Sequence, residues 1–335
     1  MTAITGTVAS ADVAASPART PRVVKDVPSR VDRVFNRVTL AAGLTVLGLL
    51  LLVGIYLLLR SREALSETGL WTFLTRVEWR TDVNPPRIGV LGLLTGTVVV
   101  ALIAVLIAVP FGTMAALFIT EYSSPRSRRY LTTIVDLMAA IPSLLFGLWG
   151  FLFLSGQVEP LSKWLGQNLG FIPIFATEKG ARLTGSMFIA GIVVSLMTLP
   201  IVAAVVREVF AQTPPGEKEA ALALGSTRWG MIRAVVLPYG KGGIVGGAML
   251  GMGRALGETI AVALLLPQVP EATFRILENG GATVSGFIAL RAGADAFTVS
   301  GLMAAGLVLF VLTLATNMVA SVVVSRSRSG QGVEL

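Results

Sequence analysis

Six stretches of this chain are each long enough and apolar enough to cross a lipid bilayer, and this feature restricts the possible folds more than any other. They cover residues 38–59, 88–109, 131–154, 183–206, 243–266 and 299–324. A helix needs about 20 apolar residues to span the hydrocarbon core of a membrane. The apolar runs are continuous rather than alternating, which favours helices over a membrane β-barrel. The sequence therefore predicts an all-α, polytopic membrane protein with six transmembrane helices.

The composition agrees with this fold and excludes several kinds of chemistry. Of the 335 residues, 54% are hydrophobic and 14% are charged, whereas soluble proteins have about 25% charged residues. The sequence has no Cys and no His, which excludes disulfides, Cys/His zinc sites and Ser-His-Asp triads. The nucleotide-binding pattern G-x-x-x-x-G-K-[ST] is also absent from the sequence. We predict a protein that is not an enzyme, with no catalytic residue and no metal site.

Lys and Arg are distributed unequally among the loops. Residues 1–37, 120–130, 207–242 and the C-terminal end carry 16 of them, against 10 in the three remaining loops. Loops rich in Lys and Arg stay on the cytoplasmic side of a membrane, so we expect both termini in the cytoplasm. The net charge of +8 then reflects membrane topology and does not indicate nucleic acid as a partner. Residues 1–37, rich in Ala, Thr, Pro and Arg, are predicted to form a disordered cytoplasmic tail.

The loop at 207–242 contains a predicted short helix. Glu217 and Glu219 lie in its first turn, where carboxylates complement the helix dipole. Strong helix formers follow, and Gly225 stands where a helix-ending residue belongs. Adjacent alanines give this helix a small-residue face that another protein's groove can approach closely.

A second short helix is predicted directly after the first. Ser226 or Thr227 can cap its N-terminus, the helix covers about 228–236, and Pro238 is expected to end it. The product is a helix–turn–helix on the cytoplasmic side.

The spacing E-A-A-x(3)-G-x(9)-[hydrophobic]-x-L-P in this loop resembles the signature of permease subunits of bacterial ABC importers. The matching residues here are Glu219, Ala220, Ala221, Gly225, Val235, Leu237 and Pro238. Val235 stands where the family usually has Ile. The resemblance implies a MetI-like permease domain of five helices at 88–325, outside which lies the first transmembrane helix at 38–59. It also implies that these residues, with Glu217, form a coupling loop that docks into a cleft of a cytoplasmic ATPase.

Two charged residues interrupt the apolar segment 243–266. Arg254 lies near its middle and Glu258 one helical turn later, on the same predicted face. Each charge at the centre of a membrane helix costs roughly 2.5–3.5 kcal/mol, so this helix is expected to face protein or water. Four glycines at a spacing that permits close helix packing support this expectation. They are Gly247, Gly251, Gly253 and Gly257.

The Arg254–Glu258 pair has two interpretations. The first is an intrahelical ion pair that neutralises itself and stabilises the bundle. The second is a site for anion passage, in which the guanidinium of Arg254 binds an oxyanion through its planar fork of donors and Glu258 orients it. Charged residues within the membrane are commonly functional, which favours the second interpretation.

The stretch GRALGETIAV at 253–262 is similar to a segment of phosphate ABC transporter permeases of the PstC type, and AAIPSLLFGLWG at 139–150 is similar to a segment found in both the PstC-type and the PstA-type subunit. Thr259 stands where sulfate and molybdate permeases usually have an aromatic residue. The resemblance implies an ATP-driven importer of inorganic phosphate in the cytoplasmic membrane, with Arg254, Glu258 and Thr259 serving translocation. A permease for sulfate or molybdate, a secondary transporter and a purely structural membrane anchor are the alternatives.

The resemblance also implies the partners of this chain. They are a sister permease of the PstA type, a dimeric cytoplasmic ATPase of the PstB type, an extracytoplasmic phosphate-binding protein of the PstS type, and membrane lipid. ATP and Mg²⁺ would bind to the ATPase, and no cofactor is expected on this chain.

Overall fold

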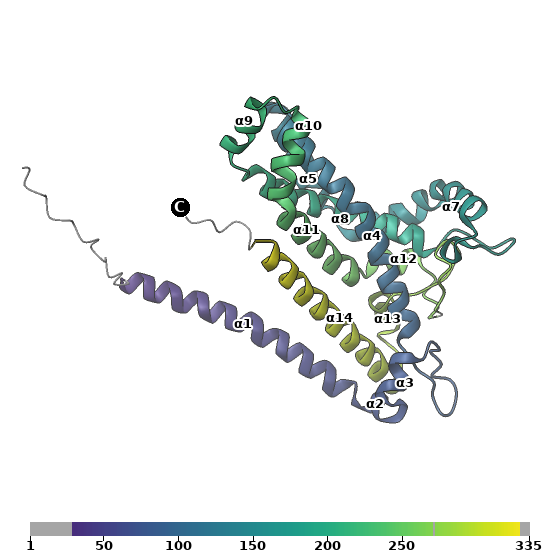
Figure 1. Ribbon diagram of the computed structural model, residues 1–335. Helices are drawn as coiled ribbons and strands as arrows, with labels where there is room; N and C mark the ends of the chain where they lie inside the picture. The colour runs from purple at the N-terminus through teal and green to yellow at the C-terminus, as the bar shows by residue number, and fades with distance from the viewer. Residues whose placement is uncertain (1–28, 271, 329–335) are drawn as a thin grey trace, which may run out of the picture. The chain divides into compact units, whose positions relative to one another are not determined.

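The computed structural model describes residues 29–270 and 272–328, and the regular secondary structure of this part is helical, without strands. The chain divides into two compact units, Met1–Leu52 and Val53–Leu335. Helix α1 (Arg30–Arg60) begins in the first unit, and all later helices belong to the second (Figure 1). The prediction of an all-α protein is confirmed.

The elements of the second unit after α1 follow one another with short connections, except between α3 and α4, between η3 and α8, and between α12 and α13. In chain order they are α2 (Arg62–Thr68), α3 (Leu70–Thr75), α4 (Leu91–Leu117), the π-helical turn η1 (Phe118–Tyr122), α5 (Pro125–Ala140), α6 (Ser143–Trp149), the π-helical turn η2 (Gly150–Leu154), α7 (Ser155–Leu169), the 3-10 turn η3 (Pro173–Phe175), α8 (Met187–Ala211), α9 (Pro215–Ala223), α10 (Arg228–Met231), the π-helical turn η4 (Ile232–Val236), α11 (Leu237–Gly257), α12 (Ile260–Leu265), α13 (Val284–Arg291) and α14 (Ala296–Arg328).

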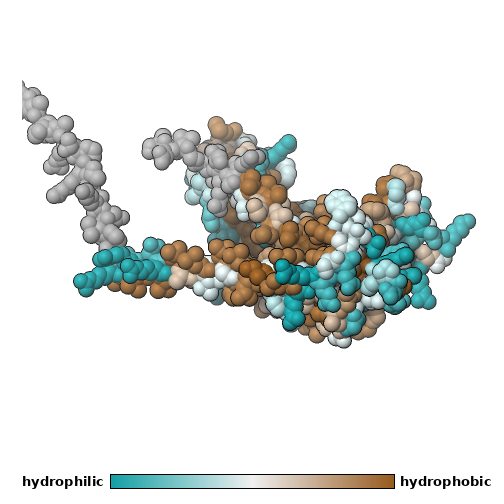
Figure 2. All heavy atoms as spheres, turned by 90° about the horizontal axis from the view of Figure 1, so that it is seen from below, coloured by the Kyte–Doolittle hydropathy of each residue, from teal (hydrophilic) through white to brown (hydrophobic). Residues whose placement is uncertain are grey.

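Helix α1 exposes apolar side chains along most of its length. In the space-filling view it is hydrophilic at its N-terminal end and hydrophobic beyond it (Figure 2). An exposed apolar helix of 31 residues is typical of a segment that contacts lipid or another membrane protein. Most of the predicted disordered tail at 1–37 lies outside the described residues, and its last part, from Arg30 onward, is helical.

Five helical segments of the described residues are long and apolar enough to cross a membrane. They are Arg30–Arg60, Leu91–Tyr122, Ser143–Leu169, Met187–Ala211 and Ala296–Val323. The prediction of a polytopic membrane protein is confirmed, but the sequence predicts six continuous spans where the described residues contain five.

The difference arises at two helix breaks. The predicted span at 131–154 is interrupted at Ile141, whose backbone is extended (ψ 129°) because a residue that precedes proline disfavours the helical conformation. The membrane-length helix therefore starts after Pro142 and runs to Leu169. The predicted span at 243–266 is interrupted at Glu258, which separates α11 from α12.

Two of the buried clusters of the second unit lie where α4, α8 and α11 pack together, and a third joins α2, α3, α4, α13 and α14. A Cβ atom at Gly251 would lie 2.7 Å from a methyl group of Thr198 on α8, and one at Gly247 would lie 3.3 Å from a valine of α8. The predicted close packing is confirmed at these two glycines. Gly253 and Gly257 do not contribute to it, since a Cβ at Gly257 would meet open space and one at Gly253 would approach α14.

Replacing Gly243 with Ala is expected to destabilise this packing. The new Cβ would lie 2.6 Å from the Cβ of Val209 on α8, and overpacking of this kind costs about 1–3 kcal/mol. The matched change Gly246→Ala places a Cβ on the same helix with no atom within 4 Å. It should stabilise the protein by about 0.5–1 kcal/mol, because alanine is the better helix former. Thermal unfolding of both variants in detergent measures the difference, and equal unfolding temperatures would contradict this account.

Candidate functional site

A partly open cavity of about 550 Å³ lies between α8, α11 and α14. Its lining residues are Ile201, Met249, Leu250, Gly253, Arg254, Thr313 and Asn317. A second cavity of about 360 Å³, beside α5, α6 and α8, is lined by apolar side chains. Of these two cavities, the first offers polar groups and a positive charge, and it is the candidate anion site.

Arg254 supplies the positive charge of this cavity from the last turn of α11. Its side chain is half-buried, and its Nε atom is buried without a hydrogen-bond partner among the described residues. A buried donor without a partner costs about 1–3 kcal/mol, so the hydrogen-bonding capacity of this guanidinium is not used up within the described residues. A guanidinium stays charged at physiological pH and presents several donors in one plane. The arrangement is therefore suited to binding an oxyanion.

Glu258 lies where the helix is broken. α11 ends at Gly257, Glu258 has an extended backbone (φ −65°, ψ 125°), and α12 begins at Ile260. The hydroxyl group of Ser285 on α13 donates to the backbone oxygen of Glu258 at 2.7 Å, a bond that takes the place of one within a helix. The prediction that Glu258 follows Arg254 on one helix face is wrong, and no ion pair joins these two side chains.

The remaining predicted passage residue, Thr259, also belongs to this break. Its hydroxyl group donates to the backbone oxygen of Gly257 at 3.0 Å. Of the three predicted residues, Arg254 lines the cavity, whereas Glu258 and Thr259 are absent from its lining. Glu258 is buried, with 8% of its surface exposed, and the intrahelical ion pair considered in the sequence analysis does not form.

Two further polar residues line the cavity and were not predicted from the sequence. Thr313 and Asn317 lie one helical turn apart on α14 and face Arg254 across the cavity. Asn317 carries both a donor and an acceptor. Its position in an otherwise apolar membrane segment is the signal that identifies it, because polar side chains at such positions are rare.

The second predicted site is formed by α9, α10 and the turn between them, which we call the coupling segment. Gly225 ends α9 with a positive φ of 84°, and its amide group donates to the backbone oxygen of Leu222 at 2.9 Å. The hydroxyl group of Thr227 accepts from the amide group of Gly230 at 3.1 Å and caps α10. The predicted helix–turn–helix is confirmed, with Thr227 rather than Ser226 as the cap.

The second helix of this segment does not end at Pro238. α10, η4 and α11 follow one another without a break from Arg228 to Gly257. Pro238 stands in the first turn of α11, where proline is tolerated, and the π-helical turn that contains Val235 precedes it. The coupling segment is thus continuous with the helix that carries Arg254.

The coupling segment exposes apolar side chains at the end of the bundle opposite α2 and α3 (Figure 1). Leu222, Leu224 and Trp229 are 45%, 86% and 56% exposed, and we call these three residues the docking patch. These apolar side chains lie in a helix–turn–helix that also exposes charged residues, so we treat them as candidates for contact with a partner. The predicted alanine face is divided, because Ala220 is exposed whereas Ala221 packs against the core below.

The other motif residues also differ in exposure. Glu217 and Glu219 are exposed on α9, Val235 and Leu237 are half-buried, and Pro238 is exposed. The residues that can meet a partner therefore gather on α9 and the start of α10, and the later motif positions support the helix beneath them.

Comparison with known proteins identifies the family of this chain. Residues 108–329 match the family described as "binding-protein-dependent transport system inner membrane component". The chain is 39% identical over 305 residues to the phosphate transport system permease protein PstC 2 of Mycobacterium tuberculosis, covering 90% of this chain and 94% of that protein. It is 35% identical to PstC of Xylella fastidiosa, covering 91% and 94%.

A similar fold occurs in the crystal structure of a bacterial ABC transporter involved in the import of the acidic polysaccharide alginate. The match has a TM-score of 0.51 and 21% identity and covers 70% of this chain and 78% of that chain. Together, the helical fold and the family match define the chain as a transport permease of the inner membrane. It belongs to the family of inner-membrane components of binding-protein-dependent transport systems. This membership disfavours a secondary transporter and a purely structural anchor.

Proposed function

We propose that this chain is the permease subunit of an ATP-driven importer that carries inorganic phosphate across the cytoplasmic membrane. The observation that carries this proposal is the guanidinium of Arg254, which lines the cavity between α8, α11 and α14 with an unpaired Nε. Phosphate accepts paired, charge-assisted hydrogen bonds from such a group. The extensive similarity to PstC proteins supports phosphate as the substrate.

Arg254 is proposed to contact the passing anion, with Asn317 and Thr313 on the facing helix. Glu258 and Thr259 are proposed to act at the helix break, where a change of backbone conformation would alter the position of Arg254. Leu250 and Asn317 are both exposed beside the cavity. A sister permease of the PstA type is therefore proposed to cover this face and to complete the pathway.

The coupling segment is proposed to dock on a dimeric cytoplasmic ATPase of the PstB type. Its proposed contact residues are Glu217, Glu219, Ala220, Ala221, Gly225 and the docking patch, with Val235, Leu237 and Pro238 in supporting positions. ATP and Mg²⁺ would bind to the ATPase, and this chain would hold no cofactor of its own. A PstS-type protein would deliver phosphate at the opposite end of the bundle.

This arrangement sets the proposed topology. The coupling segment faces the cytoplasm, and the Lys and Arg distribution supports both termini on that side. The proposed organisation is a first transmembrane helix at 38–59, with lipid along its apolar surface, and a permease domain at 88–325. Residues 1–37 would precede them in the cytoplasm.

Uptake by the complete transporter tests the substrate. Proteoliposomes that contain the four kinds of subunit are supplied with ATP inside and radiolabelled phosphate outside. We expect ATP-dependent uptake that unlabelled phosphate suppresses and that equal concentrations of sulfate or molybdate leave unchanged. Stronger suppression by sulfate or molybdate would assign the permease to that oxyanion instead, and uptake that follows an ion gradient without ATP would contradict the proposed class.

A further inference from the structure

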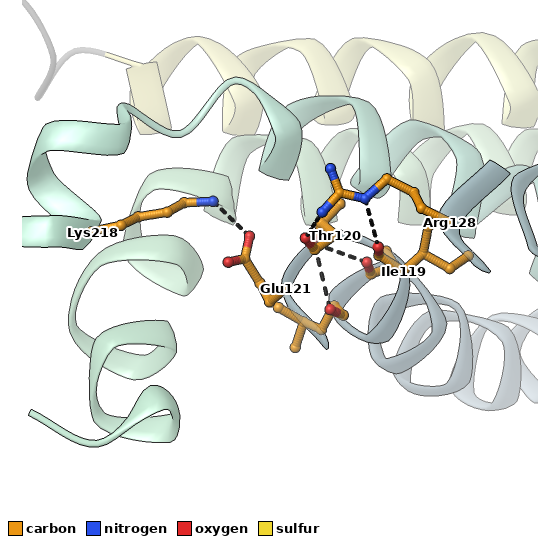
Figure 3. Close-up of polar contacts among 7 residues, drawn as sticks. Ile119, Thr120, Glu121, Arg128 and Lys218 are labelled. Carbon is orange, nitrogen blue, oxygen red and sulfur yellow. Dashed lines mark hydrogen bonds and ion pairs between the residues drawn. The ribbon is translucent and has the colours of Figure 1, made fainter. Parts of the chain in front are cut away.

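The cytoplasmic end of α4 carries a buried carboxylate that the proposed pathway does not use. α4 finishes in the π-helical turn η1, and this turn directs Glu121 into the protein, where 6% of its side chain is exposed. The ammonium group of Lys218 on α9 lies 2.6 Å from its Oε1 atom (Figure 3). Lys218 is itself 21% exposed. An ion pair with little solvent contact therefore joins the coupling segment to α4.

The turn that carries Glu121 is fixed from its other side. Arg128 on α5 donates from Nε to the backbone oxygen of Ile119 at 3.1 Å and from its terminal nitrogen to that of Thr120 (Figure 3). These carbonyl groups lie at the end of a helix, where a cation interacts favourably with the helix dipole. The hydroxyl group of Thr120 donates back to Ala116 at 3.0 Å. These contacts hold the backbone of the turn in place, and they thereby fix the position of the Glu121 carboxylate.

A second contact joins the same two parts of the molecule. The guanidinium carbon of Arg228, the first residue of α10, lies 5.2 Å from the ring centre of Tyr122, a distance typical of a cation–π interaction. Both helices of the coupling segment therefore contact consecutive residues of η1, the turn that ends α4, with Lys218 at Glu121 and Arg228 at Tyr122. A displacement of the coupling segment therefore acts on the end of α4 through Lys218, which precedes the turn at Gly225, and through Arg228, which follows it.

These contacts add a second connection between the coupling segment and the cavity. The first is covalent, because α10 continues into α11 and so reaches Arg254. The second passes through Glu121 to α4, which packs along α8 and also against α11. Since α8 and α11 both line the cavity, the two connections meet around the candidate anion site.

A buried ion pair suits this role because it resists separation. When one partner moves away, the other remains as an uncompensated charge in a poorly solvated place, which is strongly unfavourable. An exposed pair would be weak and easily broken. Separating Lys218 on α9 from Glu121 at the end of α4 is therefore unfavourable.

We infer that Glu121 and Lys218 are positioning residues that make α4 move with the coupling segment, so that ATPase movement reaches the cavity through α4 as well as through α11. This inference rests on the proposed function, since it requires an ATPase on α9 and α10.

The test measures coupling in the complete transporter. Glu121→Gln and Lys218→Gln are each assembled with the partner subunits in proteoliposomes, and phosphate uptake and ATP hydrolysis are measured on the same sample. We expect the ATPase to bind and hydrolyse ATP, while phosphate carried per ATP falls about fivefold or more, within the usual range of coupling between sites. The charge-swapped double variant Glu121→Lys/Lys218→Glu should recover a large part of the ratio.

Two matched controls remove one charge of each sign nearby. Glu208 on α8 and Arg126 on α5 are exposed, and neither makes an ion pair within the described residues. Glu208→Gln and Arg126→Gln should leave the ratio of uptake to hydrolysis unchanged. An unchanged ratio in Glu121→Gln and Lys218→Gln would overturn the inference. Loss of ATPase binding in these variants would also overturn it, because the pair would then support docking and not transmission.

A cross-linking experiment covers the case in which the Gln variants do not accumulate. This chain contains no Cys, so Glu121→Cys/Lys218→Cys introduces its only two thiols, and the single variants Glu121→Cys and Lys218→Cys control for thiols of the partner subunits. A short, reducible bifunctional thiol reagent should raise uptake per ATP in this variant, and reductant should lower it again, because α4 and α9 move together in the functional cycle. Cross-linking that stops uptake would contradict the inference. Absence of ATP-driven phosphate uptake by the wild-type complex is a different outcome, and it would overturn the proposed function together with this inference.

Discussion

Replacement of Arg254 with Ala is expected to abolish nearly all phosphate uptake by the assembled transporter. Charge-assisted hydrogen bonds contribute about 1.5–3 kcal/mol each. Because 1.4 kcal/mol corresponds to a factor of ten, the loss of two such bonds reduces the rate about a hundredfold or more. Arg254→Lys keeps the charge but lacks the planar fork, so an intermediate rate is expected. Initial rates of labelled phosphate uptake into proteoliposomes measure all three proteins.

The control for this prediction is Arg129→Ala. Arg129 is an exposed residue of α5 and does not line the cavity, so its variant should transport phosphate at close to the wild-type rate. Membrane levels and ATPase binding are measured for every variant, which separates a defect in passage from a defect in assembly. Wild-type uptake by Arg254→Ala would show that the anion does not pass this residue.

The sequence predicts the membrane helices well because their signal is local. Continuous apolar runs identify α1, α4, α8 and α14. The described structure differs from the predicted spans at two helix breaks, and the first of them follows from a local rule about proline. Pro142 imposes an extended conformation on the residue before it, and this moves the third membrane-length helix toward the C-terminus. At Glu258 the break depends on a hydroxyl group from α13, a contact between distant residues that apolar periodicity does not reveal.

The same distinction holds for the two sites. The turn at Gly225 and the cap at Thr227 follow from short-range preferences, and both are confirmed. Arg254 is recognisable as an unusual charge in an apolar segment, and it lines the cavity as expected of a residue that avoids lipid. Helical spacing predicts Glu258 on the same face as Arg254, but the helix ends at Gly257, so this prediction fails.

The pair of Glu121 and Lys218 was beyond the reach of such reasoning. The two residues are 97 positions apart, and each resembles an ordinary charged residue at the end of a membrane helix or in a loop. Their contact depends on the π-helical turn at the end of α4 and on the position of α9, which packs against α10 and η4. The position of charged residues relative to helix ends is predictable from sequence, but which distant charges meet is set by tertiary packing.

Introducing Asp at Leu224 is expected to weaken ATPase binding more than any other single change in the coupling segment. Leu224 is 86% exposed at the turn between α9 and α10, so the substitution should not disturb this chain's own fold. If the leucine is buried in the ATPase cleft, its loss removes about 1.5–3 kcal/mol of apolar burial, and the carboxylate adds the further penalty of an unpaired buried charge. Co-purification of the ATPase with the permease, and ATP hydrolysis by the complex, should both fall about a hundredfold or more.

Phe171→Asp is the matched control, because Phe171 is 79% exposed and lies just after α7, away from the coupling segment. Equal retention of the ATPase by Leu224→Asp and Phe171→Asp would contradict docking at this patch, since a leucine that remains in water in the complex has no burial to lose.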